Sequence, residues 1–242
     1  MNMSNEQFPM RINKYLAHKG ICTRRQADDW IAQGRVMVGG EPAVIGQQIQ
    51  AEDEVVVRSK DLAKAASDRV YFAFNKPIGL ATEDVLEKLV PTLPKKAKDV
   101  FPVGRLDKVS HGLLVLTNDG RVTDRLLNPK YVHDKEYVVR TDKPITQNFL
   151  TRMGKGVKLE DGYITKTAML AGEVGAKRFS IILTEGRKHQ IRRMCTVLGF
   201  AVKDLRRVRV MNLKLSGLEP GEYREVIGKE LKVFLKSLGM VK

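Results

Sequence analysis

The spacing of apolar residues separates predicted helices from predicted strands along the chain. Residues 11–19 place Ile12, Tyr15 and Leu16 on one side of a helix, because residues three and four apart share a helical face. A second helix is predicted to begin at Thr23, where the sequence Thr-Arg-Arg-Gln fits a capping box. Further helices are predicted over residues 121–127, 146–153 and 229–242.

An unbroken apolar run over residues 113–116, Leu-Leu-Val-Leu, predicts a strand that is buried on both faces. Further strands are predicted over residues 36–38, 53–57, 70–74, 135–140, 163–171, 178–183 and 203–214, with a hairpin turn at Gly39 and Gly40. Strand runs with interspersed helices and short turns predict an α+β fold. Its central sheet is expected to be mostly antiparallel and flanked by helices.

The same pattern divides the chain into two units. Residues 1–9 are predicted to be a flexible tail, and residues 10–58 to form a small domain. Residues 59–69 are polar, rich in Ala and Lys, and lack an apolar stripe, which predicts a linker. Residues 70–242 are then expected to form a second, larger domain.

The charge balance indicates what the protein binds. Lysine and arginine number 43 against 28 acidic residues, which leaves a net charge of +15 and predicts a nucleic acid partner. No apolar run approaches the roughly 20 residues that span a bilayer, and the first residues lack a secretory signal. We therefore expect a cytoplasmic protein with no membrane partner. The sequence around the two cysteines, Cys22 and Cys195, lacks the close Cys/His pairs of a zinc site, and no phosphate-binding glycine loop is present, so we expect neither metal nor cofactor.

Basic residues gather in two further patterns. In the small domain, five basic residues precede the first acid, Asp28, which predicts a phosphate-binding helical face, although a merely solvated face fits the charges as well. These are Lys19 and the four that we expect to bind RNA, Arg11, Lys14, Arg24 and Arg25. Near residue 208, Arg207 and Arg209 alternate with two valines, which predicts a strand with one exposed basic face along an RNA backbone.

Two stretches hold the candidate chemistry. In residues 103–120, Arg105 and Asp107 lie two apart beside the buried run, so they can share one face of an extended segment. From spacing alone, a structural ion pair is the commoner interpretation. In residues 184–200, a helix with Ile191, Met194, Cys195 and Leu198 on its core face is surrounded by basic side chains. These include Arg187, Arg192 and Arg193, and a nonspecific phosphate-binding helix is the alternative there.

Several motifs together resemble one family. The stretch GRLDKVSHGLLVLTNDG, the element NKPxG at residues 75–79, the tripeptide KEY at 135–137 and GRKHQIRRM at 186–194 resemble the RsuA/RluF-type pseudouridine synthases. Residues 10–57 resemble the S4-type RNA-binding domain, including its Thr-Arg-Arg element. In this resemblance His189 falls at a variable position.

The resemblance implies isomerisation of a uridine in RNA to pseudouridine, without a cofactor. It implies that Asp107 is the catalytic carboxylate and that Tyr137 removes the proton from carbon 5 of the base. It further implies that Arg192 pairs with Asp107 and keeps it ionised. Arg105 is expected to help hold the flipped nucleotide. Lys76, Arg187 and Arg193 are expected to join Arg207 and Arg209 in binding RNA.

The sequences QIRRM and RVMNLKLSGL most resemble the branch of the family that modifies large-subunit ribosomal RNA. We therefore expect 23S ribosomal RNA or an assembling large subunit as partner, and a monomeric protein. Two alternatives stay open: a non-catalytic RNA-binding protein of the S4 type, and a synthase that acts on small-subunit ribosomal RNA or on tRNA. A glycoside hydrolase is disfavoured, because no second acid stands in a comparable motif.

Overall fold

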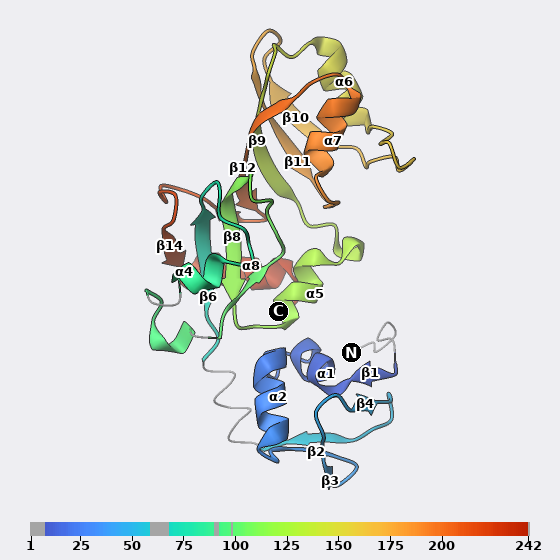
Figure 1. Ribbon diagram of the computed structural model, residues 1–242, viewed down its shortest axis with the longest axis vertical. Coiled ribbons are helices and arrows are strands. Elements are labelled where there is room, and N and C mark those ends of the chain that lie inside the picture. Colours follow the sequence, from blue (N-terminus) through green and yellow to red (C-terminus); the bar gives the residue numbers. More distant parts are fainter. Residues whose placement is uncertain (1–7, 59–67, 90–91, 98, 242) are drawn as a thin grey trace.

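The computed structural model describes residues 8–58, 68–89, 92–97 and 99–241, and the predicted tail and linker fall mainly outside these ranges. The N-terminal unit packs two helices over short strands (Figure 1). Its elements are β1 (Met10–Arg11), α1 (Ile12–His18), α2 (Arg24–Ala32), β2 (Val36–Val38), β3 (Glu41–Pro42), β4 (Gln48–Ile49) and β5 (Val55–Val57).

Local signals set the two helices of this unit as predicted. Thr23 caps α2, because its hydroxyl accepts the backbone N–H of Gln26 while the Gln26 side chain accepts the N–H of Thr23. Gly20 follows α1 with φ of 68°, a left-handed conformation that glycine adopts without strain. Gly39 and Gly40 join β2 to β3, which confirms the predicted hairpin turn.

The second unit is built on a nine-stranded sheet within the described residues, with its main path in the order β10-β11-β9-β12-β8-β6-β14. All of its strand pairs are antiparallel except β12 with β8. The strands are β6 (Tyr71–Lys76), β7 (Phe101–Val103), β8 (His111–Thr117), β9 (Lys135–Thr141), β10 (Met169–Gly172), β11 (Arg178–Leu183), β12 (Val202–Val210), β13 (Leu213–Lys214) and β14 (Tyr223–Glu225). The helices are α4 (Val85–Leu89), η1 (Lys95–Ala97), α5 (Arg121–Leu127), η2 (Pro129–Tyr131), α6 (Gln147–Lys155), α7 (Gln190–Val197) and α8 (Gly228–Ser237).

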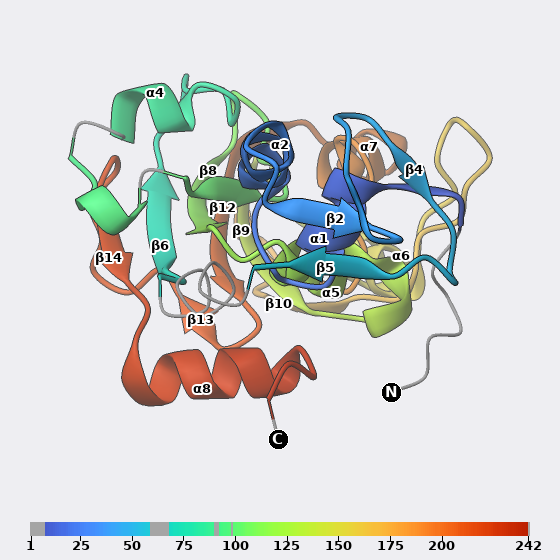
Figure 2. The same cartoon turned by 90° about the horizontal axis from the view of Figure 1, so that it is seen from below.

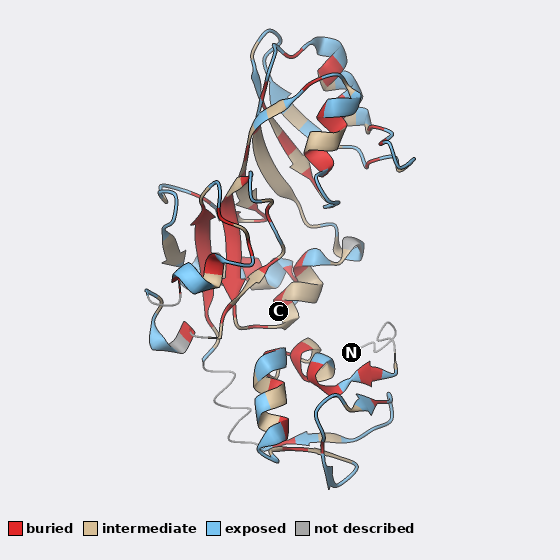
Figure 3. Ribbon diagram, viewed as in Figure 1, coloured by how far each residue is buried: buried red, intermediate tan, exposed pale blue. Residues whose placement is uncertain are grey.

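Side chains of β6 and β8 alternate between two cores, because successive residues of a strand face opposite sides of the sheet. Tyr71 and Ala73 pack with α5 and α8 on one face, and Phe72 and Phe74 pack with α4 on the other. Figure 2 shows α8 and α4 on opposite sides of β6, and Figure 3 shows β6 buried throughout and β8 buried after its first residue. The predicted strand buried on both faces is confirmed as the centre of this half.

A third core fills the other half of the sheet. Strands β9 and β11 pack against α6 and α7 through a cluster of buried residues, of which Phe149, Met153, Phe179, Ile191 and Met194 are members. Cys195 is buried in the same core and is a free thiol. The two halves of the sheet meet where β8 and β12 pair in parallel (Figure 1).

One predicted strand is mostly wrong. Within residues 163–171 only the end belongs to a strand, β10, while the preceding residues form a loop that has a single bridge from Lys158 to Ile164. The backbone N–H of Lys166 donates to the buried carboxylate of Glu185 instead of to a neighbouring strand. A side chain thus satisfies a backbone group that a sheet ladder would otherwise take.

The two units contact each other through α1, α2 and α5. Gln26 donates to Asp99 at 2.9 Å, and the guanidinium of Arg69 donates to the carbonyl of Gly20 at 2.5 Å. A methyl group at Gly120 would lie 2.8 Å from the carbonyl oxygen of Ala17, so the helices approach closely at this point. The N-terminal unit is therefore held against the larger domain by specific contacts.

Asp119 lies beneath this junction and is fully buried. Its carboxylate accepts hydrogen bonds from Arg121 at 2.6 and 2.9 Å and from the hydroxyl of Tyr71 at 2.7 Å. Burial raises the pKa of Asp119, but the hydrogen bonds and the charge of Arg121 outweigh it and hold the pKa below its usual value. The carboxylate is therefore charged and paired.

We expect Asp119→Asn to lower the free energy of unfolding by about 3 kcal/mol, because it leaves the Arg121 guanidinium partly buried without its counter-charge. Urea denaturation followed by circular dichroism measures the change. Glu173→Gln, at an exposed position of the same domain, is the control and should change stability by less than about 0.5 kcal/mol. Equal small effects of both substitutions would contradict the structural role of Asp119.

Candidate active site

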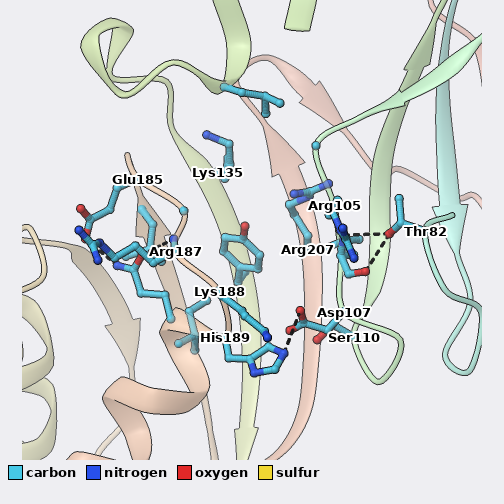
Figure 4. Close-up of a pocket in the computed structure, with 18 of the residues that line it drawn as sticks. Thr82, Arg105, Asp107, Ser110, Lys135, Glu185, Arg187, Lys188, His189 and Arg207 are labelled. Carbon is cyan, nitrogen blue, oxygen red and sulfur yellow. Dashed lines mark hydrogen bonds and ion pairs between the residues drawn. The ribbon is translucent and has the colours of Figure 1, made fainter. Parts of the chain in front are cut away.

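A cleft of about 880 Å³ lies between the two halves of the sheet. One wall is the loop before β8, which includes Gly104, Arg105 and Asp107, and the opposite wall is the segment from Leu183 to Ile191. Tyr137 lines the same cleft, so three residues singled out from the sequence are brought to one place. Figure 4 shows two of them, Arg105 and Asp107.

Hydrogen bonds from neighbouring segments hold the loop that positions Asp107. Thr82 donates its hydroxyl to the carbonyl of Leu106 and accepts the Leu106 N–H. The N–H of Gly79 donates to the carbonyl of Lys108, and the N–H of Ser110 donates to that of Asp107. The backbone on both sides of Asp107 is thereby anchored, and its carboxylate, about one third exposed, faces the cleft.

His189 is the ion-pair partner of Asp107 among the described residues, with Nε2 lying 3.4 Å from Oδ1 (Figure 4). It occupies a left-handed conformation with φ of 53° at the N-cap of α7, which turns its ring out of the helix. Gln190 fixes this turn, because its amide donates to the buried Glu185 and its carbonyl oxygen accepts the N–H of Arg187. The resemblance assigned His189 no role, and only this turn reveals its position.

The expected ion pair between Arg192 and Asp107 is wrong for this structure. The Arg192 guanidinium instead donates to the carbonyl of Val109 at 3.1 Å, to the hydroxyl of Ser110 at 3.2 Å and to the carbonyl of Val202 at 3.3 Å. The carbonyl oxygens at the end of the loop and the start of β12 need donors, and the edge of α7 places Arg192 beside them. Arg192 thus joins α7 to the end of the Asp107 loop.

Two residues expected to bind RNA are buried or already paired. Lys76 is fully buried, because β6 continues through it, and its ammonium donates to the carbonyls of Pro77 and Leu80. Burial also lowers its pKa, an effect that the charge of Asp107 partly offsets. Arg193 forms ion pairs with Glu160 and Asp161. Through these contacts, Lys76 and Arg193 stabilise neighbouring loops instead of presenting free charges at the surface.

The predicted exposed basic face of β12 is also wrong. Arg207 is only 5% exposed, and Arg209 pairs with Asp134 and Glu136. A β-bulge between Arg207 and Arg209 interrupts the simple alternation of faces. Arg207 therefore points into the cleft, where the alternating pattern could not place it (Figure 4).

The remaining candidates are exposed. Arg105 lies at the rim of the cleft and pairs with Glu83, and the guanidinium of Arg187 stacks 3.4 Å from the centre of the Tyr163 ring. In the N-terminal unit, the four basic residues of the predicted phosphate-binding face are all exposed: Arg11, Lys14, Arg24 and Arg25. Their position is compatible with contact to a large polyanion.

Within the described residues, no group of three or more His, Cys, Asp or Glu side chains could hold a metal ion. No helix in those same ranges is long and apolar enough to cross a membrane.

Comparisons with known proteins place these features in context. Residues 70–196 match the family model for RNA pseudouridylate synthase, and residues 10–55 match the S4 domain. The chain is 43% identical over 225 residues to dual-specificity RNA pseudouridine synthase RluF of Escherichia coli O157:H7, covering 92% of this chain and 77% of the relative. It is 34% identical to ribosomal large subunit pseudouridine synthase B of Bacillus subtilis, covering 92% and 94%. A crystal structure of a pseudouridylate synthase superposes with a TM-score of 0.67 at 28% identity, covering 95% of this chain and 99% of that one.

Proposed function

Because the chain belongs to the RNA pseudouridylate synthase family and carries an S4 domain, it is an RNA pseudouridine synthase, and we propose that it modifies 23S ribosomal RNA of the large subunit. The observation that carries the choice of RNA is the 43% identity to dual-specificity RNA pseudouridine synthase RluF, and the B. subtilis relative is named for the ribosomal large subunit. The substrate is either free 23S RNA or an assembling particle, in the cytoplasm, and the protein acts as a monomer.

Asp107 is the catalytic carboxylate in this proposal. It lies in a loop anchored on both sides, faces the cleft, and has His189 as its cationic neighbour when that ring is protonated. A carboxylate in this place can attack the sugar of a flipped uridine or remove a proton from its 2′ carbon. Both routes break the N-glycosidic bond and leave the base free to turn within the cleft.

Tyr137 is the residue that removes the proton from carbon 5 once the new bond has formed. It stands on β9 at the same cleft as Asp107, and its neighbours on either side in the sheet are Ile181 and Arg207. Arg105, exposed at the rim, is placed to hold the displaced nucleotide or to fill the gap that it leaves in the RNA stem. Arg192 supports the reaction by holding the end of the Asp107 loop.

The helix pair of the N-terminal unit anchors the RNA through its exposed basic residues. We expect the double substitution Arg24→Gln, Arg25→Gln to weaken binding to 23S RNA and to reduce the slope of log affinity against log salt by about 1.5, because each lost phosphate contact removes about 0.7 to 0.9. Filter binding between low and moderate salt measures the slope. Lys229→Gln with Lys232→Gln, two exposed charges on α8, is the control. An equal change of slope in the control pair would show that only net charge matters.

The experiment that tests the substrate compares three unmodified RNAs. Purified protein is incubated with transcripts of 23S ribosomal RNA, 16S ribosomal RNA and tRNA that carry tritium at carbon 5 of uridine, and tritium release is followed. We expect release from 23S RNA at about one site per molecule and none from 16S RNA. Release from tRNA alone or from 16S RNA would contradict the proposed substrate.

A further inference from the structure

The floor of the cleft carries two cationic side chains beside Tyr137. Arg207 on β12 stands directly opposite Tyr137 on β9, and residues opposite each other in an antiparallel pair share a face of the sheet. Lys135 lies two residues before Tyr137 on the same strand and therefore points to that face as well. All three line the cleft with Asp107 (Figure 4).

Arg207 is buried there without a counter-charge. Its Nε donates to the carbonyl of Leu113 at 2.7 Å, and it forms no ion pair within the described part of the chain. The nearby acids are engaged elsewhere, since Asp134 and Glu136 both bind Arg209. Gly112 keeps the neighbouring strand close, because a methyl group at that position would lie 2.2 Å from the carbonyl oxygen of Arg207. A guanidinium buried without a carboxylate is costly unless another electron-rich group binds it.

Lys135 adds a second positive charge to the same place. Its ammonium donates to the carbonyl of His133 at 3.1 Å. Burial and the nearby charge of Arg207 lower the pKa of Lys135 to about 8, and Asp134 offsets only part of this shift. Two cations held together on a buried floor favour a ligand that carries or develops negative charge.

The depth of this pair indicates which part of the RNA it meets. Exposed basic residues such as Arg105 and Lys108 line the cleft at its outer edge, a position suited to contact with RNA phosphates. The floor is reached by the part of the nucleotide that is turned inwards, which is the base. Uracil presents two carbonyl oxygens, both of which accept hydrogen bonds from a guanidinium or an ammonium.

We propose that Arg207, with Lys135 beside it, binds the carbonyl oxygens of the flipped uracil and stabilises the negative charge on the ring after it leaves the sugar. This inference rests on the proposed function. When the bond between N1 and C1′ breaks, its electron pair stays on the ring and spreads over N1 and the carbonyl oxygens. The ring then bonds to C1′ through C5, the proton on C5 leaves, and N1 gains a proton, so that the product is an isomer of the substrate. Donors that are fixed in advance act on this charge most strongly.

A substrate with a better leaving group tests this role. Fluorine at carbon 5 withdraws electrons, so 5-fluorouracil carries the negative charge more readily and needs less help from the protein. Transcripts of 23S RNA that contain uridine or 5-fluorouridine are compared at pH 6.5 under single turnover. Loss of the N-linked nucleoside at the modified site is measured by mass spectrometry of nuclease fragments.

We expect Arg207→Gln to slow the loss of N-linked uridine by about 10²-fold, the usual effect of removing one such donor, and the loss of N-linked 5-fluorouridine by less than about 10-fold. Lys135→Gln should also slow the reaction of uridine more than that of 5-fluorouridine, with smaller losses of rate than Arg207→Gln. This substitution removes only one hydrogen bond to the backbone. It therefore keeps the test decisive if Arg207→Gln fails to fold. Arg206→Gln, the adjacent position of β12, does not line the cleft and should leave both rates within about threefold.

Equal losses on the two substrates in both variants, or no loss in either, would overturn the proposal. If the unmodified protein converts neither transcript, the proposed 23S substrate has failed instead, so the two failures are distinguishable.

The titration of Lys135 supplies a separate readout. Below pH 8 the ammonium is charged, and above that pH it loses its proton. The charges that act on Lys135 are those of Arg207 and Asp134, and the neighbouring His133 has a pKa below its usual value, mainly through burial. The rate for uridine should therefore lose the contribution of Lys135 as the pH rises through about 8. Lys135→Arg should remove that part of the pH dependence, and an unchanged profile in this variant would contradict the role of Lys135.

Discussion

Asp107→Asn is expected to abolish pseudouridine formation, with a loss of about 10⁴-fold or more in single-turnover rate, while RNA affinity stays within about threefold. The substitution is nearly isosteric and removes only the charge and the nucleophilic or basic character of the carboxylate. The loop should keep its shape, because Thr82, Gly79 and Ser110 hold its backbone rather than the Asp107 side chain. Tritium release from labelled 23S RNA measures the rate, and filter binding measures the affinity.

A matched control for this substitution exists in the same domain. Asp204 also lies beside a histidine, with its Oδ1 3.0 Å from Nε2 of His111, but it does not line the cleft. Asp204→Asn should therefore keep its turnover within a few-fold of the unmodified protein. If Asp107→Asn retained substantial turnover, or if both substitutions had the same effect, the assignment of the catalytic carboxylate would be wrong.

Tyr137→Phe is expected to slow turnover by about 10²- to 10⁴-fold, because it removes the phenolic oxygen that we propose takes the proton from carbon 5. The hydroxyl makes no hydrogen bond with any described residue, and the ring packs against the core of α6 and α7, so the variant should fold normally. Single-turnover tritium release is the measurement, since the proton lost from carbon 5 is the one that is labelled.

Tyr131→Phe serves as the control for Tyr137→Phe. Tyr131 does not line the cleft, although its ring stacks on His133, which does, and loss of the Tyr131 hydroxyl should not alter the rate beyond about threefold. Turnover of Tyr137→Phe within a few-fold of the unmodified protein would reduce Tyr137 to a packing residue of β9.

Most of the fold could be predicted from the sequence, because the helices and strands indicated by local sequence patterns bury the same apolar residues that form the observed cores. The capping box at Thr23 and the alternation along β6 and β8 correspond to the observed structure. The spacing of residues 163–171 predicts a strand, but residues 163–168 lie in a loop. Their position in a loop depends on the buried Glu185, which accepts hydrogen bonds from Tyr163 and from the backbone of Lys166. A partner 19 or more residues away is not visible in local spacing.

The sequence motifs predicted which backbone segments border the candidate site. They did not predict which groups the long side chains contact there. Asp107 and Tyr137 meet because the loop before β8 and the strand β9 border one cleft. The Arg192 guanidinium was expected to pair with the carboxylate of Asp107, but it donates to the carbonyls of Val109 and Val202. The helical spacing alone does not distinguish these two arrangements. A left-handed backbone conformation turns His189 toward Asp107, and a β-bulge lies next to Arg207 in the strand that carries it to the cleft. Neither feature follows from the regular period of a helix or a strand.

We propose that this protein makes pseudouridine in large-subunit ribosomal RNA through Asp107. The most direct test deletes its gene, maps pseudouridine across ribosomal RNA and tRNA, and restores either the unmodified protein or Asp107→Asn at equal abundance. We predict that pseudouridine disappears from one site in 23S RNA, returns with the unmodified protein, and does not return with Asp107→Asn. An unchanged map after deletion, or full restoration by Asp107→Asn, would contradict the account.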